Sequence, residues 1–216
     1  MDWVGEEVFP LIRIVDYGVG NNQAFLTLFK RLGLRAERAT SPLDLKDATR
    51  LILPGVGHFD HAMKSLNNSG MRSELERKVC DEKVPVMGIC VGMQMLSASS
   101  EEGKTPGLGW IPGEVKAFSN NPLTANLAMP HMGWNDLAVS SEALLFSKGF
   151  EKSPQFYFLH SYYFDARDKE DVVATANYGI DFDVVVSRGN VHGVQCHPEK
   201  SHHWGLQLIR NFAEHS

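Results

Sequence analysis

The chain has 216 residues, a formal net charge of −5 and 43% hydrophobic residues. This is the composition of a globular protein, and it excludes a disordered or fibrous chain. The acidic balance, without a basic block, gives no electrostatic basis for nucleic-acid binding. A chain of this length can bury one sizeable core. We therefore expect a single domain over 1–216, with a poorly ordered N-terminal extension over 1–10.

Cysteine usage and the N-terminal residues predict the compartment. Cys80, Cys90 and Cys196 lie far apart, without the spacing of a metal site. An odd number of dispersed cysteines argues against a disulfide framework and fits a reducing compartment. The acidic N-terminus lacks the pattern of a signal peptide, and no apolar run reaches the length of a membrane span. We predict a cytoplasmic protein with no membrane partner.

The N-terminal half alternates predicted strands and helices. The strands are expected over 11–15, 34–39 and 51–53, and the helices over 24–32, from Pro42 onward, 58–66 and 71–80. Residues 16–21 form a glycine loop after the first strand, but this loop lacks the third glycine of a dinucleotide-binding motif. A tight turn is therefore the preferred interpretation. The alternation predicts a parallel sheet that binds ligands at the carboxyl ends of its strands.

After Leu96, short alternating segments replace this pattern. They are expected at 113–118, in a loop over 130–135, and at 155–164, 171–178, 184–186 and 191–196. We interpret them as largely antiparallel strands, in the same sheet or beside it, before a last helix over 204–212. The predicted fold class is α/β, an open, mostly parallel sheet flanked by helices with added antiparallel strands.

Cys90 lies between a predicted buried strand over 84–89 and residues 91–96, which have helical spacing. Gly88 and Gly92 stand two residues to either side. This is the arrangement of a nucleophile elbow, in which a tight turn presents the nucleophile. A helix start also favours the thiolate, so the thiol pKa is expected to fall below its usual value. On this feature alone a buried, unreactive cysteine remains the alternative.

A base for this cysteine is predicted at the end of the last strand. Alternation places His197 on the face opposite Cys196, and Pro198 ends the strand. Glu199 can then accept the second imidazole N–H. Cys90, His197 and Glu199 thus fit the roles of nucleophile, base and orienting group.

The other histidines are assigned to less specific roles. A metal site formed by His197, Glu199, His202 and His203 is the weaker interpretation because the spacing is irregular, and we expect neither metal nor cofactor. His202 and His203 are expected at the exposed start of the last helix. A structural role is preferred for His131 and His160.

Several motifs together carry a family resemblance. They are DYGVGN, LPGVGHF, GICVGMQML, SEEG, PHMGWN, FLHSYY and QCHPEKS. Through them the chain from about Arg13 onward resembles the triad-type class I glutamine amidotransferases, and among these the glutaminase subunits of imidazole glycerol phosphate synthase. The resemblance implies hydrolysis of L-glutamine to glutamate and ammonia through a thioester on Cys90. It also implies an open sheet flanked by helices.

The resemblance further implies roles for individual residues. The amides of Val56 and Val91 match the oxyanion hole. The matching glutamine-binding positions are Gly55, Gly57, Gln94, Glu102, Ser161 and Tyr162. Positions at the interface of a heterodimer with a barrel-type synthase (cyclase) subunit are matched by Asn21, Trp134 and Lys200. Gly55 and Gly57 would let the Val56 peptide rotate, so we expect a slow isolated chain that the partner activates.

The chain departs from the family pattern at three places. Cys196 replaces a phenylalanine, Asn22-Gln23 replaces a more apolar pair, and about ten residues precede the expected start. Three alternatives therefore stay open. One is a paralogous glutaminase that feeds a sugar amidotransferase in surface-polysaccharide synthesis. The others are a cysteine hydrolase of small esters and a non-catalytic scaffold subunit with a vestigial site.

Overall fold

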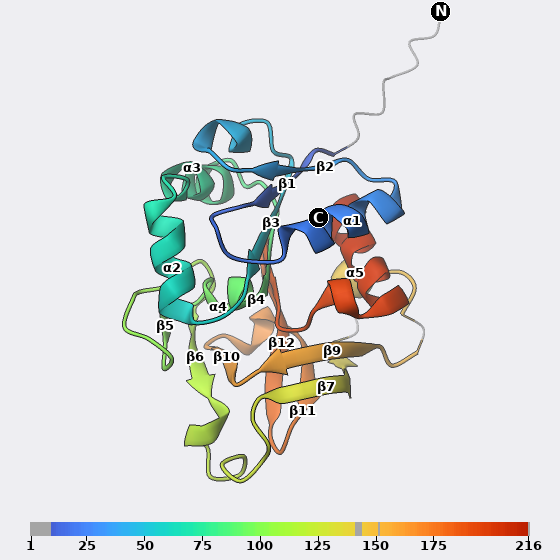
Figure 1. Cartoon of the computed structure of the whole chain (residues 1–216). Coiled ribbons are helices and arrows are strands. Elements are labelled where there is room, and N and C mark those ends of the chain that lie inside the picture. Colours follow the sequence, from blue (N-terminus) through green and yellow to red (C-terminus); the bar gives the residue numbers. More distant parts are fainter. Residues whose placement is uncertain (1–9, 141–143, 151, 216) are drawn as a thin grey trace, which may run out of the picture.

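The computed structural model describes residues 10–140, 144–150 and 152–215 (Figure 1). The predicted extension over 1–10 lies, apart from Pro10, outside the described residues. Within the described ranges, eleven strands form one sheet, and its main path has the order β2-β1-β3-β4-β13-β12-β10-β6-β5. Strand β11 pairs with β12 and β8, while β7 and β9 form a separate two-stranded sheet.

Half of the main sheet is parallel. Its strands are β1 (Ile12–Val15), β2 (Ala36–Ala39), β3 (Arg50–Gly55), β4 (Val86–Cys90) and β13 (Val191–Val194). The added strands are β5 (Ser99–Ser100), β6 (Gly113–Ala117), β8 (Ala138–Val139), β10 (Tyr162–Ala166), β11 (Val172–Asn177) and β12 (Asp181–Arg188). They pair antiparallel, except that β5 runs parallel to β6. The predicted fold class is confirmed.

Helices cover both faces of the parallel half. Helices α2 (Phe59–Asn68) and α3 (Arg72–Glu76) lie on one side, and α1 (Asn22–Leu32) and α5 (His202–His215) lie on the other (Figure 1). The short helix α4 (Val91–Gln94) follows β4 directly. Single turns are η1 (Pro42–Leu45), η2 (Arg77–Asp81), η3 (Phe118–Asn120), η4 (Leu144–Phe146), η5 (Lys169–Asp171) and η6 (Pro198–Lys200).

Local sequence explains where α1 begins and ends. The Asn21 side chain accepts a hydrogen bond from the Ala24 N–H at the N-cap. Gly33 takes a left-handed conformation, with φ of +72°, and its N–H bonds to carbonyls of the last turn. Between these caps Phe25 and Phe29 are buried against the sheet. The predicted end of the helix at Leu32, before Gly33, is confirmed, whereas the helix begins at Asn22, two residues before the predicted start.

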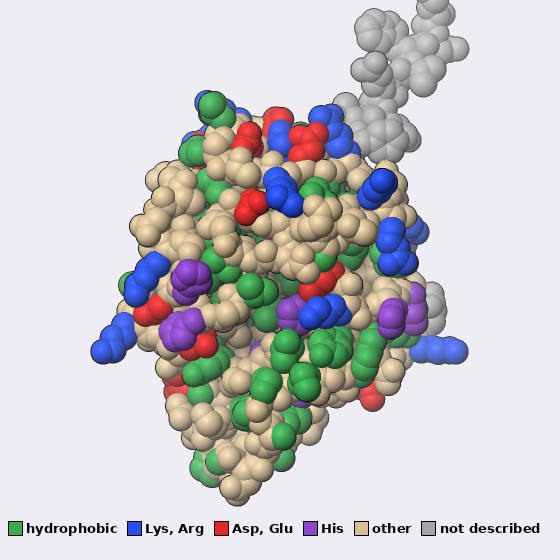
Figure 2. All heavy atoms as spheres, viewed as in Figure 1, with side chains coloured by type: hydrophobic (Ala, Val, Ile, Leu, Met, Phe, Trp, Pro, Cys, Tyr) green, Lys and Arg blue, Asp and Glu red, His purple; other side chains and the backbone are tan. Residues whose placement is uncertain are grey.

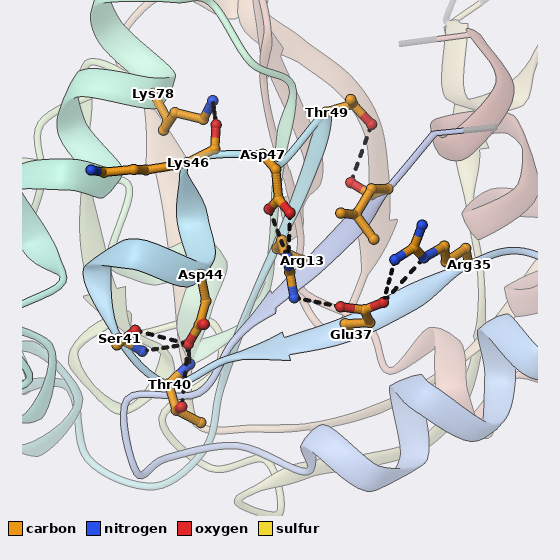
Figure 3. Close-up of polar contacts among 11 residues, drawn as sticks. Arg13, Arg35, Glu37, Thr40, Ser41, Asp44, Lys46, Asp47, Thr49 and Lys78 are labelled. Atoms are coloured by element: carbon orange, nitrogen blue, oxygen red, sulfur yellow. Dashed lines mark hydrogen bonds and ion pairs between the residues drawn. The ribbon is translucent and has the colours of Figure 1, made fainter. Parts of the chain in front are cut away.

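Hydrogen-bonded ion pairs link strands β1 and β2 at the edge of the sheet (Figure 3). Arg13 on β1 donates to Glu37 on β2 at 2.7 Å and to Asp47 at 2.9 and 3.0 Å. Beside them, the Asp44 carboxylate accepts from the N–H groups of Thr40 and Ser41, both at 2.9 Å. This caps η1, so the predicted start at Ser41-Pro42 holds, although the element is one 3₁₀ turn.

Three sequence predictions about elements are wrong in detail. The helix expected over 71–80 is α3 followed by a π turn, η2, in which the Glu82 N–H bonds to the Arg77 carbonyl. Hydrophobic periodicity does not resolve one extra residue per turn. The segment expected over 155–164 is two strands, β9 (Gln155–His160) and β10, separated at Ser161. Strand β13 ends at Val194, before the predicted Cys196.

The stretch over 130–135 is a strand and not a loop. Strand β7 (His131–Asp136) pairs antiparallel with β9 along six residues. The glycine at position 133 is a residue that weakens strands, so the sequence resembled a loop. In the structure Gly133 has a φ of +131° within the strand. Its partner strand lies some 25 residues further along, so only the tertiary fold shows the pairing. No helix in the described ranges is long and apolar enough to cross a membrane.

Candidate active site

Cys90 occupies a strained turn at the centre of the sheet. It is the last residue of β4, and its φ of +56° and ψ of −114° lie where non-glycine residues are rare. Such strain persists only where the surrounding structure enforces it, and it is common at functional sites. The helix that follows has only four residues, Val91–Gln94, so the longer helix expected over 91–96 is wrong. The dipole available to the thiolate is correspondingly small.

Glycines make this turn possible because the backbones pack directly on one another. A Cβ atom on Gly88 would lie 2.5 Å from the Gly92 carbonyl oxygen, and one on Gly92 would lie 1.9 Å from the Leu53 carbonyl oxygen. A Cβ on Gly55 would meet the Gly92 nitrogen at 2.3 Å. Gly55 is thus a packing position between β3 and the elbow, and its expected place among the glutamine-binding residues stays a prediction.

The neighbouring strand brings His197 toward the elbow. Strand β13 runs parallel to β4, with Val194 opposite Ile89, and His197 follows three residues later. The His197 N–H donates to the Tyr157 carbonyl at 2.9 Å, and Ser201 Oγ donates to the His197 carbonyl at 2.7 Å. These bonds fix the backbone of His197, although it lies beyond the end of the strand.

Glu199 holds the imidazole of His197 from behind. His197 Nδ1 and Glu199 Oε1 are 2.9 Å apart, and both side chains are buried. Burial alone would lower the pKa of His197, but the contacts with Cys90 and Glu199 outweigh it and raise this pKa to about 10. His197 Nε2 makes no hydrogen bond of normal geometry to the described part of the chain. That nitrogen is therefore available to a reacting group.

A cavity of about 300 Å³ opens beside these residues. Its lining includes most of the residues predicted for the site: Val56, Gly57, Cys90, Val91, Gln94, Glu102, Ser161, Tyr162 and His197. Pro130, Leu159 and His160 complete the lining. Gly55 and Glu199 are not part of it. The cavity thus joins the elbow, the glycine loop after β3 and the segment between β9 and β10.

Two polar side chains in this cavity are held by neighbours. Gln94 Nε2 donates to the Tyr162 carbonyl at 3.1 Å and to Gln195 Oε1 at 3.0 Å. Glu102 Oε2 accepts from the Phe59 N–H at 2.8 Å, at the start of α2. This leaves the second carboxylate oxygen of Glu102 and the single amide oxygen of Gln94 for a ligand. A carboxylate and an amide oxygen in one small cavity suit a ligand with an ammonium group.

Sequence reasoning missed two residues of this site. Gln195 is fully buried, and its Nε2 lies 3.8 Å from Cys90 Sγ. The alternation that places His197 on the face opposite Cys196 also places Gln195 on the same face as His197. The sequence could therefore have predicted Gln195 as a site residue. His160 was assigned a structural role, yet it lines the cavity. Its position directly before Ser161 was the available clue.

The predicted interface residues lie outside the cavity. Asn21 and Lys200 line a separate groove of about 430 Å³ that also includes Glu199. Trp134 on β7 is 47% exposed and stacks on His202 with ring centroids 5.3 Å apart. The Lys200 ammonium lies 5.5 Å from the Tyr157 ring centroid.

A hydrophobic patch covers the outer face of β7 and β9 (Figure 2). Met132, Trp134 and Leu159 form this patch, and they are 65%, 47% and 37% exposed. Met132 lies opposite Leu159 in the pairing of the two strands. Patches of large exposed apolar side chains mark interaction surfaces.

The metal interpretation receives no support from the geometry. Among the described residues, no group of three or more histidine, cysteine, aspartate or glutamate side chains could hold a metal ion. His202 and His203 are exposed at the start of α5, where the sequence placed them.

Comparison with known proteins identifies the family. The family model for class I glutamine amidotransferases matches residues 13–215. The chain belongs to the class I glutamine amidotransferases. This amidotransferase is 54% identical to the imidazole glycerol phosphate synthase subunit HisH of Bdellovibrio bacteriovorus, over 94% of this chain and all of that one. It is 49% identical to the subunit of the same name from Leptospira borgpetersenii, over 94% and 99%.

Solved structures support the fold of this amidotransferase. A crystal structure of a glutamine amidotransferase superposes with a TM-score of 0.73 at 23% identity, covering 94% of this chain and 97% of that chain. The structure of PurLQS from Thermotoga maritima superposes with a TM-score of 0.72 at 19% identity, covering 94% and 97%. The resemblance stated from the sequence motifs is confirmed.

Proposed function

We propose that this chain is the glutaminase subunit of an imidazole glycerol phosphate synthase. It hydrolyses L-glutamine to glutamate and ammonia and passes the ammonia to the cyclase subunit, in histidine biosynthesis. The observation that carries the proposal is the strained Cys90 turn beside the His197–Glu199 pair in one polar cavity. The identity of 54% to a subunit of that name supports the choice of partner over a polysaccharide-pathway paralogue.

The chemistry requires a Cys90 thiolate beside a protonated His197. The raised pKa of His197 keeps its ring protonated at neutral pH, next to Cys90. The Cys90 thiolate attacks the side-chain amide carbon of glutamine and forms a tetrahedral oxyanion. His197 Nε2 donates its proton to the departing nitrogen, which leaves as ammonia, and a thioester remains. The neutral imidazole then removes a proton from water, which attacks the thioester and releases glutamate.

Backbone donors would stabilise both tetrahedral oxyanions. The Val91 N–H is the first of α4, so no intrahelical carbonyl accepts from it. The Val56 N–H would supply the second donor from the loop that follows β3. Loss of one such donor costs about 10²–10³-fold in rate. We propose that rotation of the Val56 peptide keeps the isolated chain slow until the partner binds.

Glutamine would be held by its α-amino and α-carboxylate groups. Glu102 has one free oxygen for the ammonium group, and Gln94 Oε1 is a second acceptor. Backbone groups of Ser161 and Tyr162 face the same cavity. This arrangement favours an amino acid over a simple ester, because a simple ester has no ammonium group to pair with the remaining Glu102 oxygen.

The partner would dock beside the groove and the hydrophobic patch. Asn21 and Lys200 lie in the groove next to Glu199, and Trp134 lies in the patch. We propose a heterodimer in which a barrel-type cyclase covers these residues and receives the ammonia away from water. The reaction consumes soluble metabolites, so we place the enzyme in the cytoplasm.

The proposal is tested with the purified chain and the cyclase subunit of the same organism. The complex should form imidazole glycerol phosphate with either glutamine or ammonium salts as the nitrogen source. Cys90→Ala should abolish the glutamine-dependent reaction and leave the ammonium-dependent one intact. Adding the cyclase and its ligand should raise glutamate release at least about 10²-fold, the value of one oxyanion donor.

Three outcomes would contradict this function. Undiminished glutamate release by the Cys90→Ala complex would exclude the thioester. Absence of glutamate release by the wild-type complex would favour a scaffold. Full activity of the isolated chain, unchanged by the cyclase, would exclude activation by the partner while leaving the triad in place.

A further inference from the structure

A row of buried and half-buried hydrogen bonds runs inward from strand β7 to the active-site cavity. Asn135 Nδ2 lies 3.3 Å from His131 Nε2, and His131 Nδ1 lies 2.9 Å from His160 Nε2. His160 Nδ1 in turn lies 2.8 Å from the Tyr162 carbonyl oxygen. His131 and His160 stand directly opposite each other across β7 and β9, so both rings lie on the same face of this small sheet. We call Asn135, His131 and His160 the histidine relay.

The direction of every bond in the relay is determined. The Tyr162 carbonyl can only accept, so His160 Nδ1 must donate to it. A neutral imidazole carries one proton, so His160 Nε2 accepts from His131 Nδ1. His131 Nε2 then accepts from the Asn135 amide. Burial lowers the pKa of His160 to about 3 and that of His131 to about 4, so both rings are neutral at pH 7.

Aromatic side chains enclose the two imidazoles. The His131 ring stacks on Tyr178 with centroids 4.2 Å apart, and the His160 ring lies 5.5 Å from Phe118 and 5.3 Å from Phe182. Both histidines are buried. In such surroundings a ring nitrogen that loses its partner cannot bond to water instead, so breaking one bond of the relay is costly.

The inner end of the relay reaches the residues around Cys90. The Tyr162 carbonyl accepts from His160 and also from Gln94 Nε2. Gln94 bonds to Gln195, whose amide nitrogen lies close to Cys90 Sγ. The two donors on one carbonyl therefore orient both the Ser161–Tyr162 backbone and the Gln94 amide.

We propose that His131 and His160 are positioning residues that hold the Ser161–Tyr162 segment and Gln94 in the geometry that binds glutamine. This role rests on the proposed function, because it requires glutamine as the substrate. The outer end of the relay lies on β7, whose opposite face carries Met132 and Trp134 of the hydrophobic patch. The same strand thus joins the proposed docking surface to the proposed glutamine site.

The kinetic test uses the complex with the cyclase subunit. His131→Phe keeps a ring but removes the donor to His160, and it should raise KM for glutamine about tenfold, the value of one hydrogen bond. The kcat value should change much less, because the relay touches no reacting atom. His131→Asn, which keeps a donor near the Nδ1 position, should restore most of the loss. Should His131→Phe not fold, Asn135→Ala should raise KM in the same direction.

A matched control separates positioning from general stability. His192 is another buried histidine, bonded to Ser187 at 2.7 Å and packed edge-on against Phe212. It does not line the cavity. His192→Phe should lower stability without changing KM. An unchanged KM in His131→Phe, or an equal rise in His192→Phe, would overturn the proposal.

A spectroscopic test is independent of glutamine. In the [¹⁵N]histidine-labelled chain, long-range ¹H–¹⁵N spectra should assign the Nδ1–H tautomer to both His131 and His160. An Nε2–H tautomer at either ring would overturn the relay whatever the enzyme's substrate. If the wild-type complex failed to hydrolyse glutamine, the proposed function would fall, while the tautomers would still show whether the relay exists.

Discussion

Adjacent asparagines at the start of α1 differ in the hydrogen bonding of their side chains. The Asn21 side chain caps the helix, whereas Asn22 is buried and its Oδ1 has no hydrogen-bond partner in the described part of the chain. Loss of a cap costs about 1 kcal/mol. An unsatisfied buried carbonyl costs about 1–3 kcal/mol. Asn22 is also one of the departures from the family pattern.

We therefore expect Asn21→Ala to lower and Asn22→Leu to raise the free energy of unfolding, each by about 1 kcal/mol. Denaturant titration of the isolated chain measures both. Because the two positions are neighbours, each variant serves as the control for the other. A loss of stability in Asn22→Leu would mean that its amide has a partner in solution.

Two carboxylates of the site should affect different kinetic constants. Glu199 supports the raised pKa of His197, so Glu199→Gln should move that pKa downward and reduce kcat by about 10²–10⁴-fold, the range of general acid–base catalysis. Glu102→Gln should mainly raise KM, because Glu102 is proposed to bind the substrate ammonium. NMR titration of His197 and steady-state kinetics of the complex test this pair. If Glu199→Gln and Glu102→Gln reduced kcat equally, the proposed difference between a catalytic and a substrate-binding carboxylate would be wrong.

The triad and the histidine relay differ in how far the sequence predicts them. Cys90 is marked by flanking glycines, and His197 and Glu199 follow from one strand end. The relay instead depends on which residue of β7 lies opposite His160. A shift by one position would turn His131 outward. Sequence alone does not fix that register.

At the scale of elements, the glycines of the chain differ in whether they tolerate substitution by alanine. Gly92→Ala would place a Cβ against the Leu53 carbonyl, so β3 and the elbow could not both keep their positions. Gly70 follows α2 with φ of +75° and open space around it. Alanine there costs only the left-handed conformation, about 1–2 kcal/mol. Thermal unfolding should show a mild shift for Gly70→Ala and loss of the folded state, or of the site, for Gly92→Ala.

The parallel half was predictable mainly from β3 and β4, whose apolar runs Leu51–Leu53 and Val86–Met87 lie before glycine turns and helices. The antiparallel half was less so. Strand β7 alternates buried His131 with exposed Met132 and Trp134, which inverts the usual pattern of apolar residues inside. We propose that a partner covers this outward apolar face, and an isolated sequence does not contain that partner.

At the scale of the whole molecule, buried histidines make the fold sensitive to acid. Burial lowers the pKa of His131 and His192 to about 4 and that of His160 to about 3. The unfolded chain, with histidine pKa near ~6.5, binds more protons than the folded one between these values. Stability should therefore fall as the pH drops from about 6.5 to 4, by up to about 1.4 kcal/mol per pH unit for each histidine.

His197 acts in the opposite direction at higher pH. Its folded-state pKa of about 10 lies above the unfolded value, so its stabilising contribution is complete below about pH 6.5 and is lost as the pH rises toward 10. Stability should thus be greatest near neutral pH. Urea unfolding from pH 4.5 to 9.5 tests this, and His192→Phe should flatten the acid side. A midpoint independent of pH between 7 and 5 would contradict the assignment.

The pairing of β13 with β4 also matters while the chain is being synthesised. Gln195 and Cys90 are 105 positions apart, and His197 comes later still. At about 5–20 residues per second, a ribosome needs roughly 5 to 20 seconds to reach His197, the proposed base, after it has made Cys90, the proposed nucleophile. During that interval β4 lacks its neighbour β13 and has an open edge, which can pair with another chain. A nascent chain that has made Cys90 but not His197 lacks the proposed base, so we expect it not to hydrolyse glutamine.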